Sequence, residues 1–317
     1  MRTDDPFHAD ESALQEFMGV REEARQRGAA SIRPFMPEQH QRFFESLPLA
    51  FIATLDHLGH PQADALAGSP GMLRAVTPTL LAVNDTSREH TLRLLRTGAP
   101  MGLLGIDFTN GRRNRANGVI QRHDGDNDGI ELRVTQSFGN CPRHIHVRRP
   151  DPVLAVATTA LDPHSLVETA ATFFIASRSA ELDPARGGGV DISHRGGAPG
   201  FVRWADGDTV IFDDVRGNNF FNTLGNILSD RRVSLLFIDF DNGRQLRIAG
   251  DATLAAPSAS RPVQVRVRVR HTTLISEMPE LRWPLVAPAS PCSSCAAGEA
   301  SPEALLPVPH LSTKESK

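Results

Sequence analysis

The feature that most constrains the fold of this 317-residue sequence is an internal repeat. The segment Leu103-Leu-Gly-Ile-Asp-Phe-Thr-Asn-Gly-Arg112 returns 132 residues later as Leu235-Leu-Phe-Ile-Asp-Phe-Asp-Asn-Gly-Arg244, and Arg115 and Gly118 recur at the same offset as Arg247 and Gly250. Asn-Gly between two apolar runs is a strong β-hairpin signal. Two copies of one strand-rich unit predict a mainly β protein with a few helices, built as two tandem barrels.

Two further matches place the start of each copy. Phe51-Ile-Ala corresponds to Phe174-Ile-Ala, and Gly68-Ser-Pro-Gly corresponds to Gly197-Ala-Pro-Gly. These matches divide the chain into an N-terminal helical segment (1–37), a first barrel (38–149), a second barrel (150–275) and a flexible tail rich in proline, serine and alanine (276–317).

Local patterns predict the individual elements. Helices are expected at Asp10–Arg27, with Ser12 and Gln15 as a capping box and Gly28 as C-cap, after Pro37, and at Ser87–Leu95. Strands are expected at Leu49–Leu55, 80–83 and Gly102–Ile106, and Val263–Val269 reads as a half-exposed edge strand.

Composition describes a globular protein without a nucleic-acid or membrane partner. The net charge is -3 and the apolar content is 40%, with no run long enough to span a membrane and no signal-peptide pattern. Three cysteines, Cys141, Cys292 and Cys295, form no disulfide framework, so we expect a cytoplasmic location. The only lysines are Lys314 and Lys317, which argues against a pyridoxal-phosphate Schiff base.

The second copy carries the segment with the clearest binding chemistry. Two strands, Val202–Trp204 and Val210–Phe212, lead into a glycine- and amide-rich loop and a helix predicted at Phe220–Leu228. The start of a helix leaves backbone N–H groups free and suits a phosphate. His194, Arg195 and Arg216 add donors nearby. On residue types alone, a plain hairpin followed by a capped helix is the simpler interpretation.

Other motifs point to structural roles. The stretch Arg122–Gly129 imitates a calcium loop, but Thr135 stands where the closing glutamate should be, so we expect a hairpin turn. Cys292 and Cys295 have zinc or redox spacing without a second ligand pair. Cys141 is either a reactive thiol or a small core residue. We therefore expect no metal site.

Together, three motifs resemble those of the pyridoxamine 5'-phosphate oxidase-like flavoproteins, in particular their tandem-domain flavin-nucleotide-binding branch. They are Ser193-His-Arg-Gly-Gly-Ala-Pro-Gly-Phe201, Gly217-Asn-Asn-Phe-Phe-Asn-Thr-Leu-Gly-Asn226 and Phe138-Gly-Asn-Cys-Pro-Arg143. The resemblance covers residues 8 to 275 and implies two FMN-binding split barrels, with FMN, or alternatively FAD, held between them. A homodimer supplies both barrels in most of the family, whereas here one chain could act as an internal pseudo-dimer.

The resemblance also implies cofactor-binding residues, while catalytic residues stay unassigned. These are His194, Arg195 and Gly196 along the flavin, Phe212 and Asp213 on the next strand, Arg216, Gly217, Asn218 and Asn219 at the phosphate, and Thr223 and Asn226 on the helix behind. In the first copy, Ala65-Leu-Ala-Gly68 replaces the Ser-His-Arg-Gly piece and Asn84-Asp-Thr-Ser-Arg88 replaces the Gly-Asn-Asn loop. We therefore expect one flavin site per chain, in the second copy.

The implied activity is an FMN-dependent oxidoreductase. NADH or NADPH, or a separate reductase, would supply electrons for a small-molecule acceptor. Pyridoxamine phosphate oxidase activity itself is not expected, because the family's C-terminal substrate-binding segment has no counterpart here. The alternative is a non-catalytic flavin or haem carrier with the same fold.

Overall fold

The computed structural model describes residues 5–84, 95–123, 129–140, 143–151, 162–215, 217–257, 262–275 and 278–287. The helices are α1 (Ala9–Phe17), α2 (Arg21–Ser31), α3 (Glu38–Glu45), α5 (Pro163–Thr169) and α6 (Asn222–Ser229), with short 3-10 turns at Pro184–Arg186 and Pro279–Leu281. The first-half strands are β1 (Leu49–Leu55), β2 (Pro61–Ala67), β3 (Leu73–Thr77), β4 (Leu80–Asn84), β5 (Pro100–Asp107), β6 (Arg112–His123) and β7 (Gly129–Gly139). The others are β8 (Val147–Arg148), β9 (Thr172–Arg178), β10 (Val190–Gly196), β11 (Val202–Ala205), β12 (Thr209–Asp213), β13 (Arg232–Asp239), β14 (Arg244–Ala255), β15 (Gln264–Ile275) and β16 (Leu285–Ala287).

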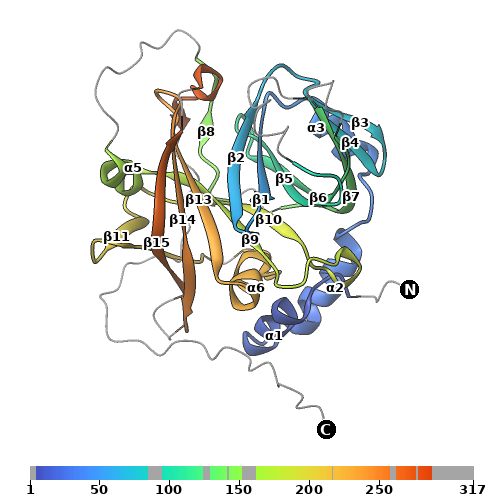
Figure 1. Cartoon of the computed structure of the whole chain (residues 1–317), viewed down its shortest axis with the longest axis horizontal. Helices are drawn as coiled ribbons and strands as arrows, with labels where there is room; N and C mark the ends of the chain where they lie inside the picture. Colours follow the sequence, from blue (N-terminus) through green and yellow to red (C-terminus); the bar gives the residue numbers. More distant parts are fainter. Residues whose placement is uncertain are drawn as a thin grey trace.

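The two copies of the repeat form two sheets with equivalent topology. The first has seven antiparallel strands in the order β2-β1-β5-β6-β7-β4-β3, and the second has seven in the order β10-β9-β13-β14-β15-β12-β11. Each sheet curls into a barrel, and β9 and β10 run between the two barrels (Figure 1). The predicted mainly β fold of two tandem split barrels is therefore confirmed.

The repeated hairpin has the same construction in both halves. Asp107 and Asp239 end β5 and β13, and each accepts a backbone N–H from the turn that follows, that of Thr109 at 2.9 Å and that of Asp241 at 3.2 Å. The glycine of each Asn-Gly pair has φ of +75°, a conformation that glycine adopts without strain. The shared motif thus determines the turn, as the sequence predicts.

The repeated glycines Gly118 and Gly250 mark β-bulges. The register shifts next to each of them, between β6 and β7 and between β14 and β15. A Cβ atom would lie 2.0 Å from the Arg133 carbonyl oxygen at Gly118 and 2.4 Å from the Arg268 carbonyl oxygen at Gly250. Only glycine allows this close approach, so the recurrence reflects the bend of the barrel wall.

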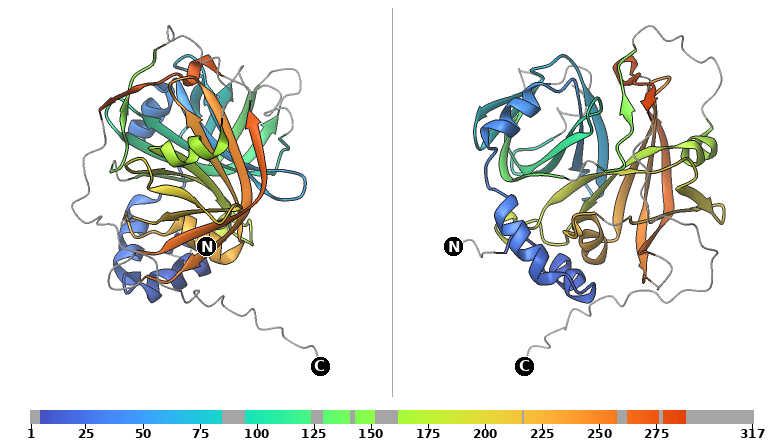
Figure 2. Two further views of the ribbon diagram at one scale, coloured as in Figure 1. Left: turned by 90° about the vertical axis from the view of Figure 1, so that its left-hand side faces the viewer. Right: turned by 180° about the vertical axis from the view of Figure 1, so that it is seen from behind.

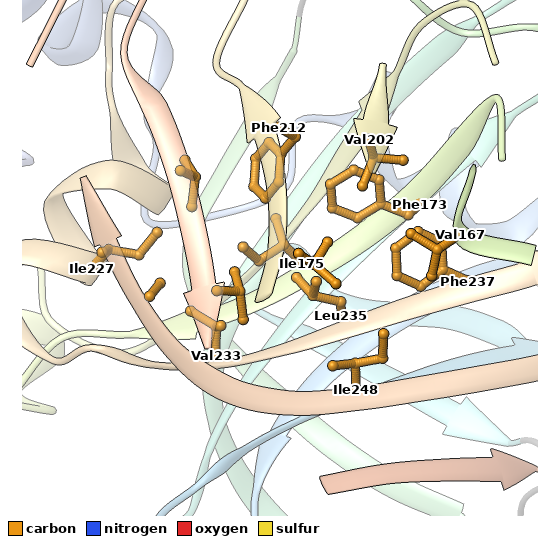
Figure 3. Close-up of a cluster of buried hydrophobic side chains, with 14 of the residues drawn as sticks. Val167, Phe173, Ile175, Val202, Phe212, Ile227, Val233, Leu235, Phe237 and Ile248 are labelled. Atoms are coloured by element: carbon orange, nitrogen blue, oxygen red, sulfur yellow. The ribbon is translucent and has the colours of Figure 1, made fainter. Parts of the chain in front are cut away.

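The second barrel encloses an aromatic core. Phe173, Phe212 and Phe237 face one another inside it (Figure 3), with 4.9 Å between the ring centroids of Phe173 and Phe212. β15 contributes Val265 and Val267 to this core, with arginines on its other face, as its alternation predicts. Its predicted place at a sheet edge is wrong, because β15 lies between β14 and β12. The alternation reflects a barrel wall with one buried face.

The two halves pack through a third apolar cluster. Phe51 of β1 and Phe174 of β9, which are equivalent in the repeat, stack with ring centroids 3.5 Å apart and an interplanar angle of 17°. Phe108, Leu236 and Phe240 also belong to this cluster. Equivalent surfaces of the two halves therefore contact each other, as the two subunits of a symmetric dimer do.

The N-terminal segment contains two helices where the sequence predicts one. The chain breaks between α1 and α2 at Gly19, whose φ is +68°. The predicted capping box is also wrong: α1 already begins at Ala9, and the backbone N–H of His8 donates to Glu11 Oε2 at 2.9 Å. Gly28 lies inside α2, where a Cβ would meet the Phe7 ring at 2.6 Å, so its role is packing.

The predicted flexible tail begins too early at residue 276. Met278, Leu281 and Trp283 are buried in the cluster between the halves, and β16 pairs with β8. These apolar side chains hold residues 278–287 against the body of the protein. The helix expected at Ser87–Leu95 and the aspartates of the calcium-like loop fall on residues outside the described ranges, apart from Leu95.

Candidate functional site

A pocket lies where the two halves meet, and we call it the junction pocket. Its first-half wall comes from β5, β6 and the segment after β7, and its second-half wall from β10 and from the loop that leads into α6. Its empty volume is about 860 Å³, including the solvent at its mouth. The lining residues are Leu104, Arg113, Arg115, Asn140, Arg143, His144, Ser193, His194, Arg195, Gly196, Asp214, Val215, Gly217, Asn218, Asn219, Phe221, Asn222, Thr223 and Leu224.

The β10 side of the pocket carries a partly buried ion pair. The Arg195 guanidinium lies 3.0 Å from Asp214 Oδ1. Burial raises the pKa of the Asp214 carboxyl, and Arg195 opposes that rise. Arg195 is therefore held at the pocket wall with one fixed counter-charge, while its Nε has no hydrogen-bond partner among the described residues.

The loop before α6 brings backbone amides to the pocket. Asn219 and Phe221 adopt left-handed conformations, with φ of +62° and +58°. Phe221 is the N-cap of α6 and makes no side-chain capping hydrogen bond. The first N–H groups of α6 therefore lack a cap at the end of the helix that lines the pocket, which is the arrangement that binds anions.

Arg115 of β6 joins the first half to this second-half wall. Its Nη2 donates to Ser193 Oγ at 2.6 Å, and its Nη1 donates to Asp191 Oδ1 at 2.9 Å and to Asn222 Oδ1 at 3.3 Å. Thr223 Oγ1 donates to the same Ser193 oxygen at 3.0 Å. Arg115 thus fixes β10 and the start of α6 relative to each other.

His194 is buried and neutral. Burial lowers the pKa of its imidazole well below the usual value, and the nearby arginines Arg113 and Arg195 lower it further. Arg113 Nη1 lies 3.4 Å from His194 Nδ1, and a guanidinium can only donate. Nδ1 is therefore the acceptor and Nε2 carries the hydrogen, in a tautomer assigned from this contact.

Several buried donors around the pocket have no partner within the described part of the chain. They are Asn140 Nδ2, His194 Nε2 and Arg195 Nε. Buried polar groups are almost always paired with protein, water or ligand. Three of the four non-glycine residues with positive φ among those described, His144, Asn219 and Phe221, also lie here. Such a concentration of unpaired donors and strained backbone is typical of a binding site.

The structure brings most of the predicted site residues together. His194, Arg195, Gly196, Gly217, Asn218, Asn219 and Thr223 all line the junction pocket. Asn226 lies behind it and hydrogen-bonds to His8, Ser177 and Asp191. Arg216 lies outside the described residues.

Besides Asn226, two predicted site residues that the structure describes do not line the pocket. The Phe212 side chain points into the core of the second barrel (Figure 3), where it packs on Phe173. Asp213 is exposed and accepts a hydrogen bond from Gln264 at 3.1 Å. The neighbouring Asp214 reaches the pocket instead, because side chains alternate between the two faces where a strand ends.

Sequence reasoning missed the arginines and polar residues of the first-half wall. Arg113, Arg115 and His144 are far from β10 in sequence and meet it only when the halves pack. One signal was available: Arg115 recurs as Arg247 in the repeat. Asn140 and Arg143 belong to one of the motifs that carry the family resemblance, without an assigned role.

The position equivalent to this site in the other half has different chemistry. Arg247, the counterpart of Arg115, contacts Gln62 and forms an ion pair with Asp64. Ala65 and Leu66 of β2 stand where the second half has His194 and Arg195. This side therefore lacks the second half's imidazole and guanidinium.

No group of three or more metal-binding side chains is assembled among the residues that the structure describes. Cys141, Cys292 and Cys295 fall outside those residues. None of the described helices combines the length and the hydrophobicity that crossing a bilayer requires.

Comparisons with known proteins give matches of structure alone. Neither a protein-family model nor a curated protein sequence matches this chain. HupZ from Group A Streptococcus is 14% identical, with a TM-score of 0.28, and the match covers 40% of this chain and 95% of HupZ. An F420 reductase is 17% identical (TM-score 0.28; 36% of this chain, 98% of that one), and an FMN-binding protein from Syntrophomonas wolfei is 12% identical (TM-score 0.27; 36% and 84%). Each match spans about the length of one barrel.

Proposed function

We propose that the junction pocket binds one FMN per chain. One observation carries the proposal: an uncapped helix start and the arginines Arg113, Arg115, Arg143 and Arg195 line a pocket whose buried donors are incompletely paired. A phosphate group is stabilised by backbone amides and by fixed positive charge.

The residues divide into two roles in this proposal. Asn218, Asn219 and the first residues of α6 would hold the phosphate, with Arg115 behind them. His194 and Arg195 on β10 would line the ring system, where His194 offers a hydrogen-bond donor to a ring acceptor atom. Gly196 allows the His144 backbone to pack against this wall, because a Cβ there would lie 2.1 Å from the His144 carbonyl oxygen.

We propose further that the bound flavin serves an oxidoreductase reaction. FMN supplies two-electron redox chemistry when bound, and the protein contributes position and electrostatics. NADH or NADPH is the proposed electron donor, either directly or through a separate reductase, and the acceptor is a small molecule. Both walls of the pocket come from one chain, so the proposal requires no second copy.

The geometry at His194 argues against iron ligation by this residue in a haem carrier. A histidine ligates a metal through an unprotonated ring nitrogen. Here Arg113 donates to Nδ1, so the buried Nε2 carries the hydrogen. In this tautomer His194 supplies a donor to a ligand and no lone pair to a metal.

Anaerobic mixing of the FMN-loaded protein with NADH or NADPH tests the redox part of the proposal. We expect the visible flavin absorbance to bleach faster than that of free FMN in the same buffer. Bleaching no faster than that of free FMN with either nucleotide would identify a flavin carrier, or an enzyme served by a separate reductase.

A further inference from the structure

The N-terminal helix α1 packs directly on α6, the helix whose start lines the junction pocket. The two helices lie side by side below the second barrel (Figure 2). Gly225 of α6 makes the contact, because a Cβ there would lie 2.5 Å from Glu11 Cγ and 2.8 Å from Glu11 Cα. The N-terminal segment therefore belongs to the immediate support of the pocket.

Polar side chains of this segment hold the residues that shape the pocket. Asn222 Nδ2 donates to Glu11 Oε1 at 2.5 Å, and Gln15 Nε2 donates to the Phe220 carbonyl oxygen at 3.0 Å. Phe220 precedes the left-handed N-cap Phe221, and Asn222 is the first residue of α6. Glu11 is thus connected to the pocket wall through its hydrogen bond with Asn222, which lines the pocket.

Glu11 is a buried carboxyl group, 3% exposed. Burial raises its pKa to about 7, Asp191 adds to the rise, and His8 and the hydrogen bond from Asn222 oppose it. The ionisable groups that face it are His8, with Nε2 3.7 Å from Oε2, Asp191 of β10, and Arg115, which shares Asn222 with it. Because burial raises this pKa toward neutrality, a change in nearby charge shifts the ionisation of Glu11.

We propose that Glu11 is a positioning residue that takes up a proton when a phosphate group binds at the start of α6. This inference rests on the proposed phosphate site. A bound phosphate dianion would lie on the other side of Asn222 from the carboxylate, and two like charges in a buried setting favour protonation of the weaker acid. The protonated carboxyl still accepts the Asn222 hydrogen bond through its carbonyl oxygen.

The linkage has a definite sign. FMN binds best when Glu11 is protonated, so its affinity falls as the pH rises above about 7, by at most about tenfold per pH unit. The phosphate of FMN titrates near pH 6 and is a dianion above about pH 7.5. Between pH 7.5 and 9 a fall in affinity therefore reports a protein group.

Calorimetric titration of the full chain with FMN at pH 8, in two buffers of different ionisation enthalpy, measures the proton uptake directly. The wild-type protein should take up a fraction of one proton per FMN bound. Riboflavin, which lacks the phosphate, should bind without this uptake. This comparison of FMN with riboflavin uses the wild-type protein alone, so no effect of a substitution on folding can influence it.

Two glutamate variants on the same helix assign the proton. Glu11→Gln should abolish the uptake and flatten the pH dependence, so that its affinity relative to wild type increases from pH 7.5 to 9. Glu16→Gln, at an exposed position of α1, should behave as wild type. A purely structural role for Glu11 predicts one constant loss of affinity at every pH.

The outcomes separate the two claims. FMN binding without proton uptake, or with uptake that persists in Glu11→Gln, overturns the inference and leaves the flavin site standing. No FMN binding at all overturns the flavin site and the inference together. Uptake that is present with FMN, absent with riboflavin and absent in Glu11→Gln supports both.

Discussion

Arg115 and Asp191 form a buried ion pair across the two halves of the chain, with 2.9 Å between Nη1 and Oδ1. The repeat places Arg247 and Asp64 in the equivalent relationship, with the acid moved by two residues along the strand. In the second half the carboxylate at 191 leaves Ser193 facing the pocket, whereas in the first half Asp64 takes the place of that serine. One duplicated arginine thus supports a ligand site on one side and a closed ion pair on the other.

Exchanging each carboxylate for an amide should separate these roles. Asp191→Asn and Asp64→Asn should each lower the free energy of unfolding by about 1.5–3 kcal/mol, because each weakens a charge-assisted hydrogen bond, to the buried Arg115 or to the part-buried Arg247. Only Asp191→Asn should also weaken FMN binding, because Arg115 lines the pocket. Denaturant unfolding and FMN titration of both variants check this. Equal losses of affinity would contradict the assignment.

Removing the donors of the pocket wall should weaken FMN binding while the fold persists. We expect a loss of about ten- to hundredfold for Arg195→Ala combined with Asp214→Asn, and a smaller loss for Asn218→Ala. The double variant is needed because Arg195→Ala alone leaves the Asp214 carboxyl buried and unpaired. Arg203→Ala, on the exposed face of β11, is the control. If the control and the two site variants bind FMN equally well, the site lies elsewhere.

Stability should fall in mild acid because of His194. The native state keeps this imidazole neutral, whereas in the unfolded chain it binds a proton near pH 6.5. The unfolded state therefore gains protons first, and stability is lost as the pH falls below 6.5, by up to about 1.4 kcal/mol per pH unit from this residue. His194→Gln should reduce the slope of unfolding free energy between pH 6.5 and 5. An unchanged slope would show that other groups govern the effect.

The stacked pair Phe51 and Phe174 should be critical for the packing of the halves. Phe51→Ala should cost about 3–5 kcal/mol, as expected for a fully buried phenylalanine. A double-mutant cycle with Phe174→Ala should give a coupling of about 0.5–1.5 kcal/mol. Phe35→Ala, at a side chain that is 40% exposed, is the control and should cost less than about 1 kcal/mol. A cost for Phe51→Ala as small as that of the control would mean that the stack contributes little.

The features of the fold that could be predicted from the sequence are those that depend on residues close together in the chain. The Asn-Gly hairpins, the repeated bulge glycines and the strand pairs around them follow from turn chemistry and side-chain periodicity, and the tandem barrels follow from their repetition. The second-half wall of the pocket could be predicted from the sequence for the same reason, because His194 and Asn218 lie in one continuous strand-and-loop segment. The structure places both of them in the pocket.

What the sequence could not predict depends on contacts between distant segments. Arg113 meets His194 across 81 residues, and Trp283 is buried because residues 278–287 fold back between the barrels. Phe212 was assigned to the site because it lies in the right segment. Whether a side chain faces the barrel core or the pocket depends on where β12 ends, and a shift of one residue exchanges the two faces.

Titration of the purified full chain with FMN, followed by flavin fluorescence and absorbance, tests the central claim most directly. The account predicts saturation at one FMN per chain, with affinity strongly reduced in the variant that carries Arg195→Ala and Asp214→Asn. Saturation at two equivalents would show that the first half keeps a working site. The absence of binding, or binding unaffected by that double variant, would contradict a flavin site in the junction pocket.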